Sequence, residues 1–304
     1  MVCFPLISAP SEQPAPFVTV LSSRAIMLTW SPPDNPNGII LHYEMYRNDT
    51  LAYTGLNRKF NDTGLTPDTV YYYYIITYTE SGQTRSLDDG YVYRTFQDAP
   101  LGISAPVITD ILPRNATVSW QPPNMPNGRV TEYRLISINS RSSVEVVNCR
   151  GVIFMCELGD LKPYTVYNFS VVACTNGGCA RSNVTTILTL PTLPDFQPAP
   201  NVTSLPGGTA VRVEWDKPTE PNGRILRYEL YMRLDEDTSD GVLKFNSNSA
   251  HDPNIIIFRE ANVTGLVPFT VYEFRVRTFV AQVMGDRVSN WTRHRTGQGS
   301  KLFQ

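Results

Sequence analysis

The cysteines are the residues whose types and spacing most directly suggest covalent chemistry. Cys149 and Cys156 are seven positions apart, and Cys174 and Cys179 are five apart across the turn-like sequence Thr-Asn-Gly-Gly. Four cysteines allow three pairings, and we favour Cys149–Cys156 with Cys174–Cys179, each bond closing one local loop. The rival interpretation is a four-cysteine zinc site, but the C-x2-C pair common in such sites is missing. Cys3 is left over, and we expect it to be free or paired with an upstream module.

The acidic run at residues 235–241 is the best candidate for a metal site. Oxygen atoms at alternate positions can wrap a calcium ion, but an EF-hand loop requires glycine at position six and glutamate at position twelve. These two positions are Asp240 and Asn246 here. We therefore expect a solvated acidic loop that holds no metal.

The three histidines do not form a catalytic pattern. His42, His251 and His294 stand apart from the serine, cysteine and carboxylate arrangements that support nucleophilic catalysis. The chain also lacks the G-x-S-x-G, P-loop and H-E-x-x-H motifs. We expect no catalytic residue, no cofactor and no enzymatic activity in this chain.

Acceptor sequences for N-glycosylation are frequent. Because a glycan needs an exposed acceptor, their positions matter more than their number. Asn61 and Asn262 each precede a closing leucine by four residues, and Asn168 alternates with residues expected to point inward. Together with paired cysteines this pattern indicates a compartment outside the cytosol. The eight acceptors are Asn48, Asn61, Asn115, Asn168, Asn183, Asn201, Asn262 and Asn290.

Composition narrows the function classes further. The 304 residues include 28 acidic and 26 basic side chains, so the chain lacks the positive charge typical of proteins that bind nucleic acid. No apolar run reaches the roughly 18–20 residues that a membrane-spanning helix needs, so we expect no membrane insertion within this chain. The first residues do not resemble a signal peptide. With the cysteines and glycosylation acceptors, this leads us to expect a piece of a larger protein.

A threefold repeat underlies these residues. In each copy a tryptophan is followed six positions later by Pro-Asn-Gly and thirteen positions later by a tyrosine. A closing motif, Leu-x-Pro-x-Thr-x-Tyr, follows, and the distance from the tryptophan to its tyrosine grows from 41 to 47 to 57 positions. Insertions are thus confined to the middle of the module, where a surface loop tolerates them. The tryptophans and closing tyrosines are Trp30 and Tyr71, Trp120 and Tyr167, and Trp215 and Tyr272.

Strands connect these landmarks. Alternate positions are apolar before each tryptophan, as at Ile26, Leu28 and Trp30, and again after each closing tyrosine. A period of two predicts strands with one buried face, and Pro-Asn-Gly supplies the turns between them. No helical stripe of useful length is present. The sequence therefore predicts an all-β chain of β-sandwiches.

The tryptophan, the Pro-Asn-Gly loop, the strand tyrosine and the closing motif resemble the fibronectin type III family. The closing motif resembles its tyrosine corner, in which the phenol bonds back to nearby backbone. The resemblance implies three immunoglobulin-like sandwiches, with proline-rich linkers that favour an extended array. We place module 1 at residues 1–97 with an N-terminal extension, module 2 at 98–193, and module 3 at 194–304 with a short C-terminal tail.

A narrower resemblance joins the Trp-x-Pro-Pro-x-x-Pro-Asn-Gly loop and residues 173–179 to repeats of a large link protein of sensory hair cells and photoreceptors. It implies a non-catalytic extracellular spacer and adhesion segment of a secreted or single-pass membrane protein, in stereocilia and the photoreceptor periciliary region. The partners implied are extracellular proteins such as basement-membrane collagen, fibronectin or other link proteins. The alternative is the ectodomain of a receptor tyrosine phosphatase or kinase. Sequence beyond Gln304 would distinguish the two.

One surface of module 1 is a candidate binding patch. If Tyr43, Tyr71, Tyr73 and Ile75 face the core, their neighbours face outward and place several large side chains on one sheet. Tyrosine is favoured at interfaces, so we expect this patch to dock a partner or a neighbouring module. The alternative is that tyrosine simply suits strands. No Arg-Gly-Asp adhesive motif occurs. The residues expected to face outward are Glu44, Tyr46, Tyr72, Tyr74 and Ile76.

Overall fold

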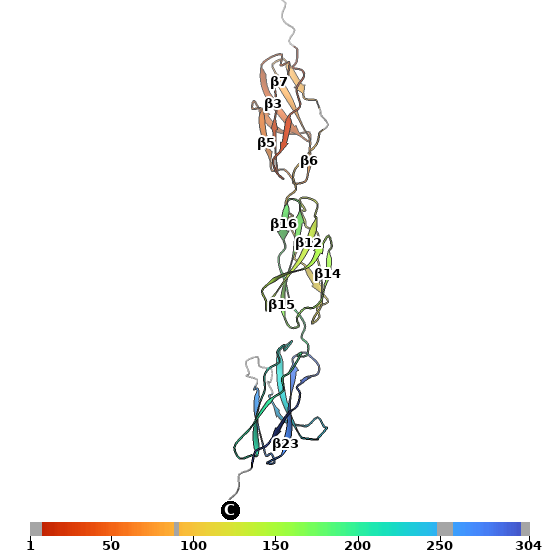
Figure 1. Cartoon of the computed structure of the whole chain (residues 1–304). Helices are drawn as coiled ribbons and strands as arrows, with labels where there is room; N and C mark the ends of the chain where they lie inside the picture. The colour runs from red at the N-terminus through yellow and green to blue at the C-terminus, as the bar shows by residue number, and fades with distance from the viewer. Residues whose placement is uncertain (1–7, 88–90, 248–257, 299–304) are drawn as a thin grey trace, which may run out of the picture.

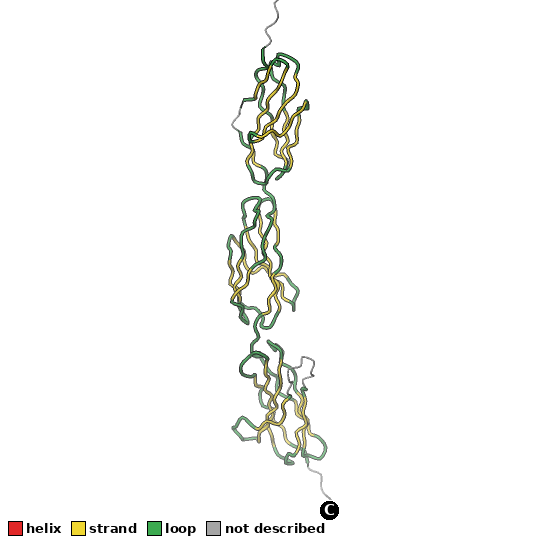
Figure 2. The backbone as a smooth tube through the Cα atoms, turned by 180° about the vertical axis from the view of Figure 1, so that it is seen from behind, coloured by secondary structure: helices red, strands yellow, loops and turns green. Residues whose placement is uncertain are grey.

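The computed structural model describes residues 8–87, 91–247 and 258–298, so Cys3 and His251 lie outside the described residues. Three β-sandwiches follow one another end to end, joined by short linkers (Figure 1). Figure 2 shows strands and loops throughout the described ranges. No helix in these ranges is long and apolar enough to span a bilayer. The prediction of an all-β chain with three tandem sandwiches in an extended array is confirmed.

Module 1 packs a three-stranded sheet, β1-β2-β5, against a four-stranded sheet, β4-β3-β7-β8, and adds a short β6-β9 ladder. All the pairings are antiparallel. The strands are β1 (Phe17–Val20), β2 (Ala25–Thr29), β3 (Ile40–Arg47), β4 (Thr50–Gly55), β5 (Lys59–Thr63), β6 (Val70–Tyr71), β7 (Tyr73–Thr79), β8 (Gly82–Arg85) and β9 (Tyr93–Arg94).

Module 2 repeats this plan with the sheets β10-β11-β14 and β13-β12-β15-β16, and β17 also pairs with β15. Its strands are β10 (Val107–Thr109), β11 (Ala116–Ser119), β12 (Glu132–Asn139), β13 (Glu145–Gly151), β14 (Met155–Leu158), β15 (Val166–Thr175), β16 (Gly178–Arg181) and β17 (Thr185–Leu188).

Module 3 has the sheets β18-β19-β22 and β21-β20-β23-β24, and β25 pairs with β23. Its strands are β18 (Asn201–Ser204), β19 (Ala210–Glu214), β20 (Ile225–Leu234), β21 (Val242–Asn246), β22 (Glu260–Thr264), β23 (Val271–Val280), β24 (Arg287–Val288) and β25 (Thr292–Arg295).

The core of each module is built on the repeated tryptophan and the strand tyrosine. Their ring centroids lie 5.8 Å apart in module 1, 6.3 Å in module 2 and 5.9 Å in module 3. Aliphatic side chains at alternate strand positions complete each core, because one face of every strand is turned inward. The three aromatic pairs are Trp30 with Tyr43, Trp120 with Tyr133, and Trp215 with Tyr228.

The closing motif forms a tyrosine corner in every module. The hydroxyl of Tyr71 accepts the backbone N–H of Thr66 at 2.9 Å. The equivalent bonds run from Lys162 to Tyr167 at 2.9 Å and from Val267 to Tyr272 at 3.1 Å. The predicted bond from the phenol back to nearby backbone is therefore confirmed three times.

Both favoured cysteine pairs are bonded in the structure. Cys174 and Cys179 face each other across the β15-β16 hairpin. Cys149 on β13 is bonded to Cys156 on β14, and these strands belong to different sheets of module 2. The second bond thus ties the two sheets together at one edge, a role that its seven-residue spacing alone did not indicate.

Candidate interaction surfaces

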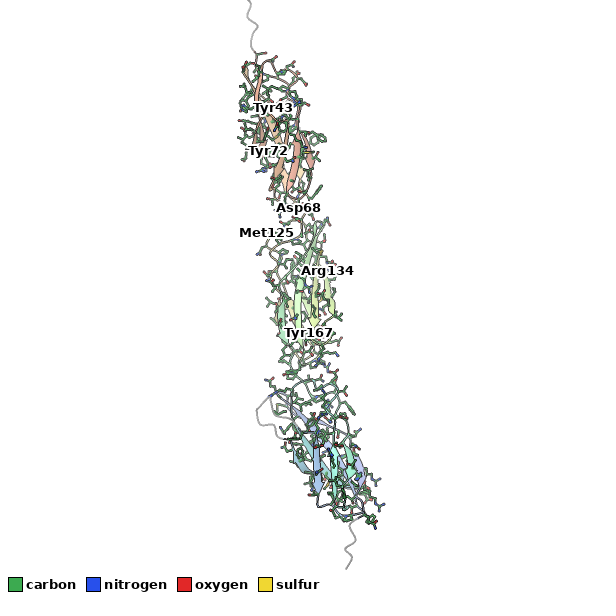
Figure 3. The ribbon with its side chains drawn as sticks, turned by 90° about the vertical axis from the view of Figure 1, so that its left-hand side faces the viewer. Tyr43, Asp68, Tyr72, Met125, Arg134 and Tyr167 are labelled. Atoms are coloured by element: carbon green, nitrogen blue, oxygen red, sulfur yellow. A yellow bond between two sulfur atoms is a disulfide. The ribbon has the colours of Figure 1, made fainter. Side chains whose placement is uncertain are left out.

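The outward side of β3 and β7 in module 1 carries a ladder of aromatic rings. We call His42, Tyr46, Tyr72, Tyr74 and Tyr78 the aromatic face; Figure 3 marks Tyr72 within the upper module. The rings of Tyr46 and Tyr74 stack with centroids 4.9 Å apart, and those of His42 and Tyr78 stack at 4.5 Å. These pairs follow the register of the two strands, which sets Tyr46 opposite Tyr74 and His42 opposite Tyr78.

Carboxylates organise the hydroxyl groups of this face. Glu44 accepts hydrogen bonds from Tyr46 at 2.9 Å and from Tyr78 at 3.0 Å, while Tyr72 donates to Asp49. The bond to Glu44 raises the pKa of Tyr46, and the bond to Asp49 raises the pKa of Tyr72. The phenols therefore stay protonated and remain fixed as hydrogen-bond donors within the face.

One expectation about this face needs correction. Tyr74 points outward as predicted but is only 8% exposed. The guanidinium of Arg85 on β8 lies 3.6 Å from the centre of its ring and covers it, a cation–π contact. Tyr46, Tyr72 and Ile76 keep intermediate exposure. The accessible part of the patch is thus formed by these neighbours and Arg85, with Tyr74 as their support.

The acidic loop of module 3 does not gather its carboxylates around a common point. Asp240 pairs with Arg275 at 2.8 Å and with Arg277 at 3.1 Å, and Asp235 pairs with Arg293. These arginines hold the pKa of Asp240 below its usual range. Across the described residues, no three histidine, cysteine or acidic side chains are placed to share a metal ion. The loop serves to neutralise arginines of the adjacent sheet.

That sheet of module 3 also holds its arginines against an aromatic ring. Trp291 lies between two guanidinium groups, 4.2 Å from Arg233 and 4.4 Å from Arg275. Arg233 in turn pairs with Glu273 at 2.7 Å. The arginines are therefore partly covered by aromatic contacts, and their charge is balanced within the module.

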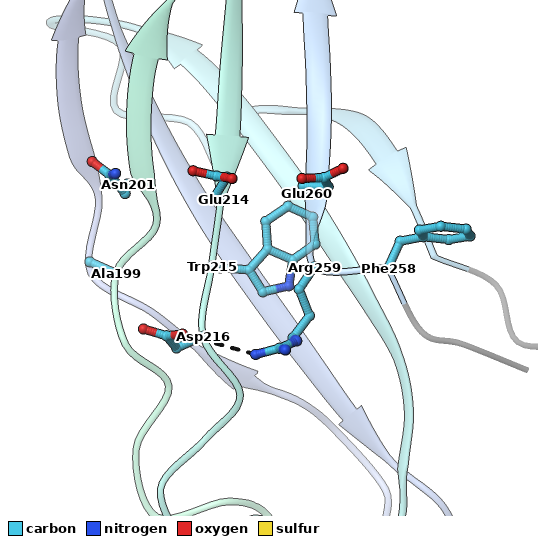
Figure 4. Close-up of a pocket in the computed structure, with 8 residues that line it drawn as sticks. All are labelled: Ala199, Asn201, Glu214, Trp215, Asp216, Phe258, Arg259 and Glu260. Carbon is cyan, nitrogen blue, oxygen red and sulfur yellow. Dashed lines mark ion pairs between the residues drawn. The ribbon is translucent and has the colours of Figure 1, made fainter.

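A shallow hollow beside Trp215 is shown in Figure 4. Arg259 and Asp216 form an ion pair of 3.9 Å on its wall, and Glu214 and Glu260 line the opposite end. It brings together no nucleophile with a base, so its geometry supports no catalytic step. The remaining lining residues are Ala199, Asn201 and Phe258.

The eight glycosylation acceptors all lie on the surface of the described chain. Asn61 on β5 and Asn262 on β22 occupy matching outward positions on the three-stranded sheets of modules 1 and 3. Asn168 lies on β15 and accepts a hydrogen bond from Thr186 through its side-chain oxygen. Every acceptor is therefore sterically open to modification.

The loops at which the chain enters each module were not anticipated as sites, yet the same geometry recurs at all three entries. The asparagine of each Pro-Asn-Gly adopts the left-handed conformation, with φ of 52° to 54°. Its amide then donates to the carbonyl of the linker residue that enters the module, at distances of 2.9–3.2 Å. The three pairs are Asn37 with Ala9, Asn127 with Ala99, and Asn222 with Leu193.

Backbone hydrogen bonds around the asparagine add to this contact, and we call the asparagine amide together with these bonds the clamp. The N–H of Asp98 donates to the carbonyl of Asn127 at 2.9 Å, and that of Leu101 donates to Met125 at 2.8 Å. Met125 and Asp68 lie where modules 1 and 2 meet (Figure 3). The turn of the β15-β16 hairpin closes the other side, because Thr175 donates to the carbonyl of Asp98 at 2.6 Å.

Ion pairs reinforce both linkers. Arg24 of module 1 pairs with Asp98 at 3.4 Å, and Arg114 of module 2 pairs with Asp195 at 3.3 Å. Both arginines stand six residues before the core tryptophan of their module. A motif first interpreted as a turn is therefore also the receptor for the preceding linker.

Comparison with known proteins agrees with this geometry. The model of the fibronectin type III domain matches residues 8–88, 98–187 and 197–295. The chain belongs to the fibronectin type III family. The matched segments each contain one tryptophan, one Pro-Asn-Gly loop and one tyrosine corner.

Several relatives carry tandem domains like these. Rat usherin is 33% identical over 314 residues and human usherin is 35% identical over 301, covering 97% and 95% of this fibronectin type III chain. The Drosophila melanogaster tyrosine-protein phosphatase Lar is 29% identical over 295 residues, covering 91% of the chain. The chain spans 6% of the length of each usherin and 14% of Lar.

A crystal structure of chicken CNTN1 FN1-FN3 domains aligns with 96% of this chain and with all of its own, at 17% identity and a TM-score of 0.44. Membership of the fibronectin type III family rests on the sequence matches. The family and the paired disulfides fit a non-catalytic segment of an extracellular protein.

Proposed function

We propose that this chain is a non-catalytic extracellular spacer and adhesion segment of a large usherin-like protein, joining membrane to matrix or membrane to membrane in sensory cells. Stereocilia and the photoreceptor periciliary region are the sites we propose. Support comes from the similarity to usherin over nearly the whole chain and from the eight exposed glycosylation acceptors. We propose module boundaries after residues 97 and 193, where each linker enters its clamp.

The clamped linker is the observation that carries the spacing role. A spacer must hold its modules in one orientation, and flexible linkers of the Gly/Ser type would not do so. Each junction here combines the asparagine amide, two backbone hydrogen bonds and a proline immediately after the clamped residue. At roughly 0.5–1.5 kcal/mol for each hydrogen bond, these contacts favour one junction geometry strongly over alternatives.

Gly177 offers a direct test of the spacer. A Cβ atom at this position would lie 2.3 Å from the backbone of Gln97, so Gly177→Ala must push the linker out of its clamp. We expect the two hydrogen bonds from Thr175 and Asn176 to this linker to be lost. Their loss should lower the free energy that favours the observed orientation of the two modules by roughly 1–3 kcal/mol. Small-angle X-ray scattering of the whole chain should then show a broader distance distribution and a changed maximum dimension.

The matched control is Gly159→Ala in the same module. Gly159 has no neighbouring atom within 4 Å of an added Cβ, so its scattering curve should coincide with that of the unchanged chain. Identical curves for Gly177→Ala and Gly159→Ala would count against a clamped spacer.

For the adhesion role we propose the aromatic face of module 1, with an extracellular protein as the partner. Basement-membrane collagen, fibronectin and other link proteins are the candidates to screen. Tyr46 and Tyr72 keep part of their rings accessible, and their hydroxyls are already fixed, so little side-chain entropy would be lost on binding. No contact in the described structure places a neighbouring module on this face.

The binding experiment uses the chain secreted from animal cells, whose intact mass should fall by whole glycans on enzymatic deglycosylation. Against immobilised collagen, fibronectin and a panel of extracellular proteins, Tyr46→Ser with Tyr72→Ser should weaken capture at least roughly tenfold. Tyr164→Ser in module 2 is the control and should leave capture unchanged. Equal capture by both variants would contradict a binding role for the aromatic face. A mass that does not change on deglycosylation would contradict glycosylation of the chain.

A second candidate function is favoured by the similarity to Lar and to rat phosphatidylinositol phosphatase PTPRQ, which is 30% identical over 225 residues. In that case the chain would be the ectodomain of a signalling receptor. A phosphatase or kinase domain encoded beyond Gln304 would favour this function over the usherin-like one.

A further inference from the structure

The outer strand of module 2 is an open sheet edge bordered by apolar side chains. β13 pairs with β12 on one side, and in the described structure no strand pairs with its other side. Its outer row of backbone N–H and C=O groups is therefore available to another strand. The exposed apolar residues on and beside it are Val146, Val147, Val152, Ile153, Phe154 and Met155.

The other two modules carry different residues at the equivalent edge. In module 1 the turn before β4 contains the glycosylation acceptor Asn48, and in module 3 β21 contains Lys244. Lysine on an edge strand is a common means of preventing edge-to-edge pairing, and a glycan on Asn48 would block the edge of module 1. The matching turn and strand of module 2 contain neither, although all three edges share one plan, with Leu51, Val147 and Leu243 at the same register position.

The charged side chains on β13 favour pairing with a second copy of the same strand. Glu145 and Arg150 lie opposite Ile138 and Arg134 of β12, which places both on the outer face of the sheet with Val147 between them. In an antiparallel pair of two such strands, related by a twofold axis between Val147 and Asn148, each Glu145 faces Arg150 of the second copy. Opposite charges at facing positions stabilise antiparallel pairs, and like charges destabilise them.

We propose that β13 pairs antiparallel with β13 of a second copy of this chain. The proposal rests on the edge alone and does not depend on the partner or tissue proposed above. The Cys149–Cys156 disulfide holds β13 beside β14 and so fixes the apolar loop at residues 152–155 in place before association. Ion pairs with Arg181 and Glu132 hold the two charged side chains at the surface, where a second strand can meet them.

The geometry has a consequence for the direction of the paired chains. Strands of module 2 run roughly along the array (Figure 1). Two copies joined through antiparallel β13 strands therefore point in opposite directions. Such a pair suits contact between chains that project from two facing surfaces.

Sedimentation velocity of the full glycosylated chain tests the pairing. A short edge interface is small, so we expect a concentration-dependent dimer in the micromolar to sub-millimolar range. Val147→Lys, whose wild-type side chain is 52% exposed, should weaken dimerisation at least roughly tenfold because two ammonium groups would meet near the axis. Leu51→Lys on β4 is the matched control at the same register position and should leave the dimer unchanged.

Charge exchange tests the register independently of folding. Glu145→Arg and Arg150→Glu should each be largely monomeric, because like charges would face each other twice in a homodimer. An equimolar mixture of the two variants should dimerise again, since the two arginines of one variant would then face the two glutamates of the other. A wild-type chain that stays monomeric, a dimer indifferent to Val147→Lys, or a mixture that fails to recover would overturn the proposal.

Discussion

Replacing Asp62 with alanine is expected to lower the free energy of unfolding of module 1 by about 3 kcal/mol, because it leaves a cation without its buried partner. Asp62 is 4% exposed and accepts two hydrogen bonds from Arg47, at 2.9 and 3.1 Å, and one from the hydroxyl of Tyr73 at 2.9 Å. Burial and this carboxylate together raise the pKa of Tyr73. The effect lies at the low end of the usual 3–5 kcal/mol because Arg47 is one-third exposed and can rehydrate.

The other modules show how the same three positions work without charge. They are filled by Ser137, Leu158 and Phe169 in module 2 and by Met232, Val263 and Phe274 in module 3, at matching strand registers. The triple change Arg47→Met, Asp62→Val and Tyr73→Phe should therefore restore wild-type stability or exceed it by about 1–4 kcal/mol. Removing one partner should therefore lower the free energy of unfolding of module 1, whereas replacing the whole network should leave it unchanged or raise it.

Hydrogen exchange of the β2 and β7 amides in the whole chain, followed by mass spectrometry in increasing urea, reports the stability of module 1 alone. Asp34→Ala in the same module is the control, since Asp34 is exposed and its side chain should contribute less than about 0.5 kcal/mol. A triple variant as unstable as Asp62→Ala would show that the buried ion pair itself, and not its disruption, determines stability.

The repeat landmarks were sufficient to predict the fold. Each tryptophan, Pro-Asn-Gly loop and closing tyrosine acts within one module, through local turns and strand alternation. The tyrosine corner could be predicted because its hydrogen bond spans only five residues, as from Thr66 to Tyr71. Interactions of this kind depend on few atoms outside the motif.

The buried position of Asp62 follows from the residue that precedes it. A glycosylation acceptor at Asn61 must face outward, and strand alternation then turns Asp62 inward. A charged residue on the inner face requires a partner, and Arg47 and Tyr73 supply it from β3 and β7. Strand alternation was sufficient to predict a buried charge at Asp62, but not which strands supply its partners.

Strand alternation predicts the direction in which a side chain points, but not how much of that side chain is exposed. Tyr74 points away from the core as predicted, but Arg85 on the next strand covers its ring. The length and flexibility of an arginine side chain decide this cover, and strand periodicity contains no information about it. The accessible surface of the candidate patch therefore could not be predicted from β3 and β7 alone.

The junction clamp lay beyond sequence reasoning for a different reason. The Asn127 amide binds Ala99 only because a left-handed backbone aims it at the linker, and the linker residue lies 28 positions away. The same bond from Asn37 to Ala9 forms at the start of module 1, so the two groups meet when the entering segment lies against the Pro-Asn-Gly loop of its own module. A turn motif therefore indicated the correct local shape and left its second role hidden.

Gln197 provides the second large expected effect, since it is completely buried and belongs to a polar pair. Its amide donates to the carbonyl of Asp216 at 2.8 Å, and its oxygen accepts from the hydroxyl of Thr278 at 2.6 Å. Gln197→Ile alone leaves the carbonyl and the hydroxyl without these bonds. At about 1–3 kcal/mol for a buried polar group without a partner, we expect module 3 to lose roughly 2–4 kcal/mol.

Module 2 contains the apolar form of the same contact. Ile103 and Ala173 stand where module 3 has Gln197 and Thr278, and Ile103 packs against the core of its module. Gln197→Ile combined with Thr278→Ala should therefore recover part of the loss, with a coupling of about 1–2 kcal/mol between the two positions. Hydrogen exchange of the β23 amides measures both single variants and the double variant. If the two losses simply add, the glutamine and threonine are independent contributors, and the parallel with module 2 reflects packing volume alone.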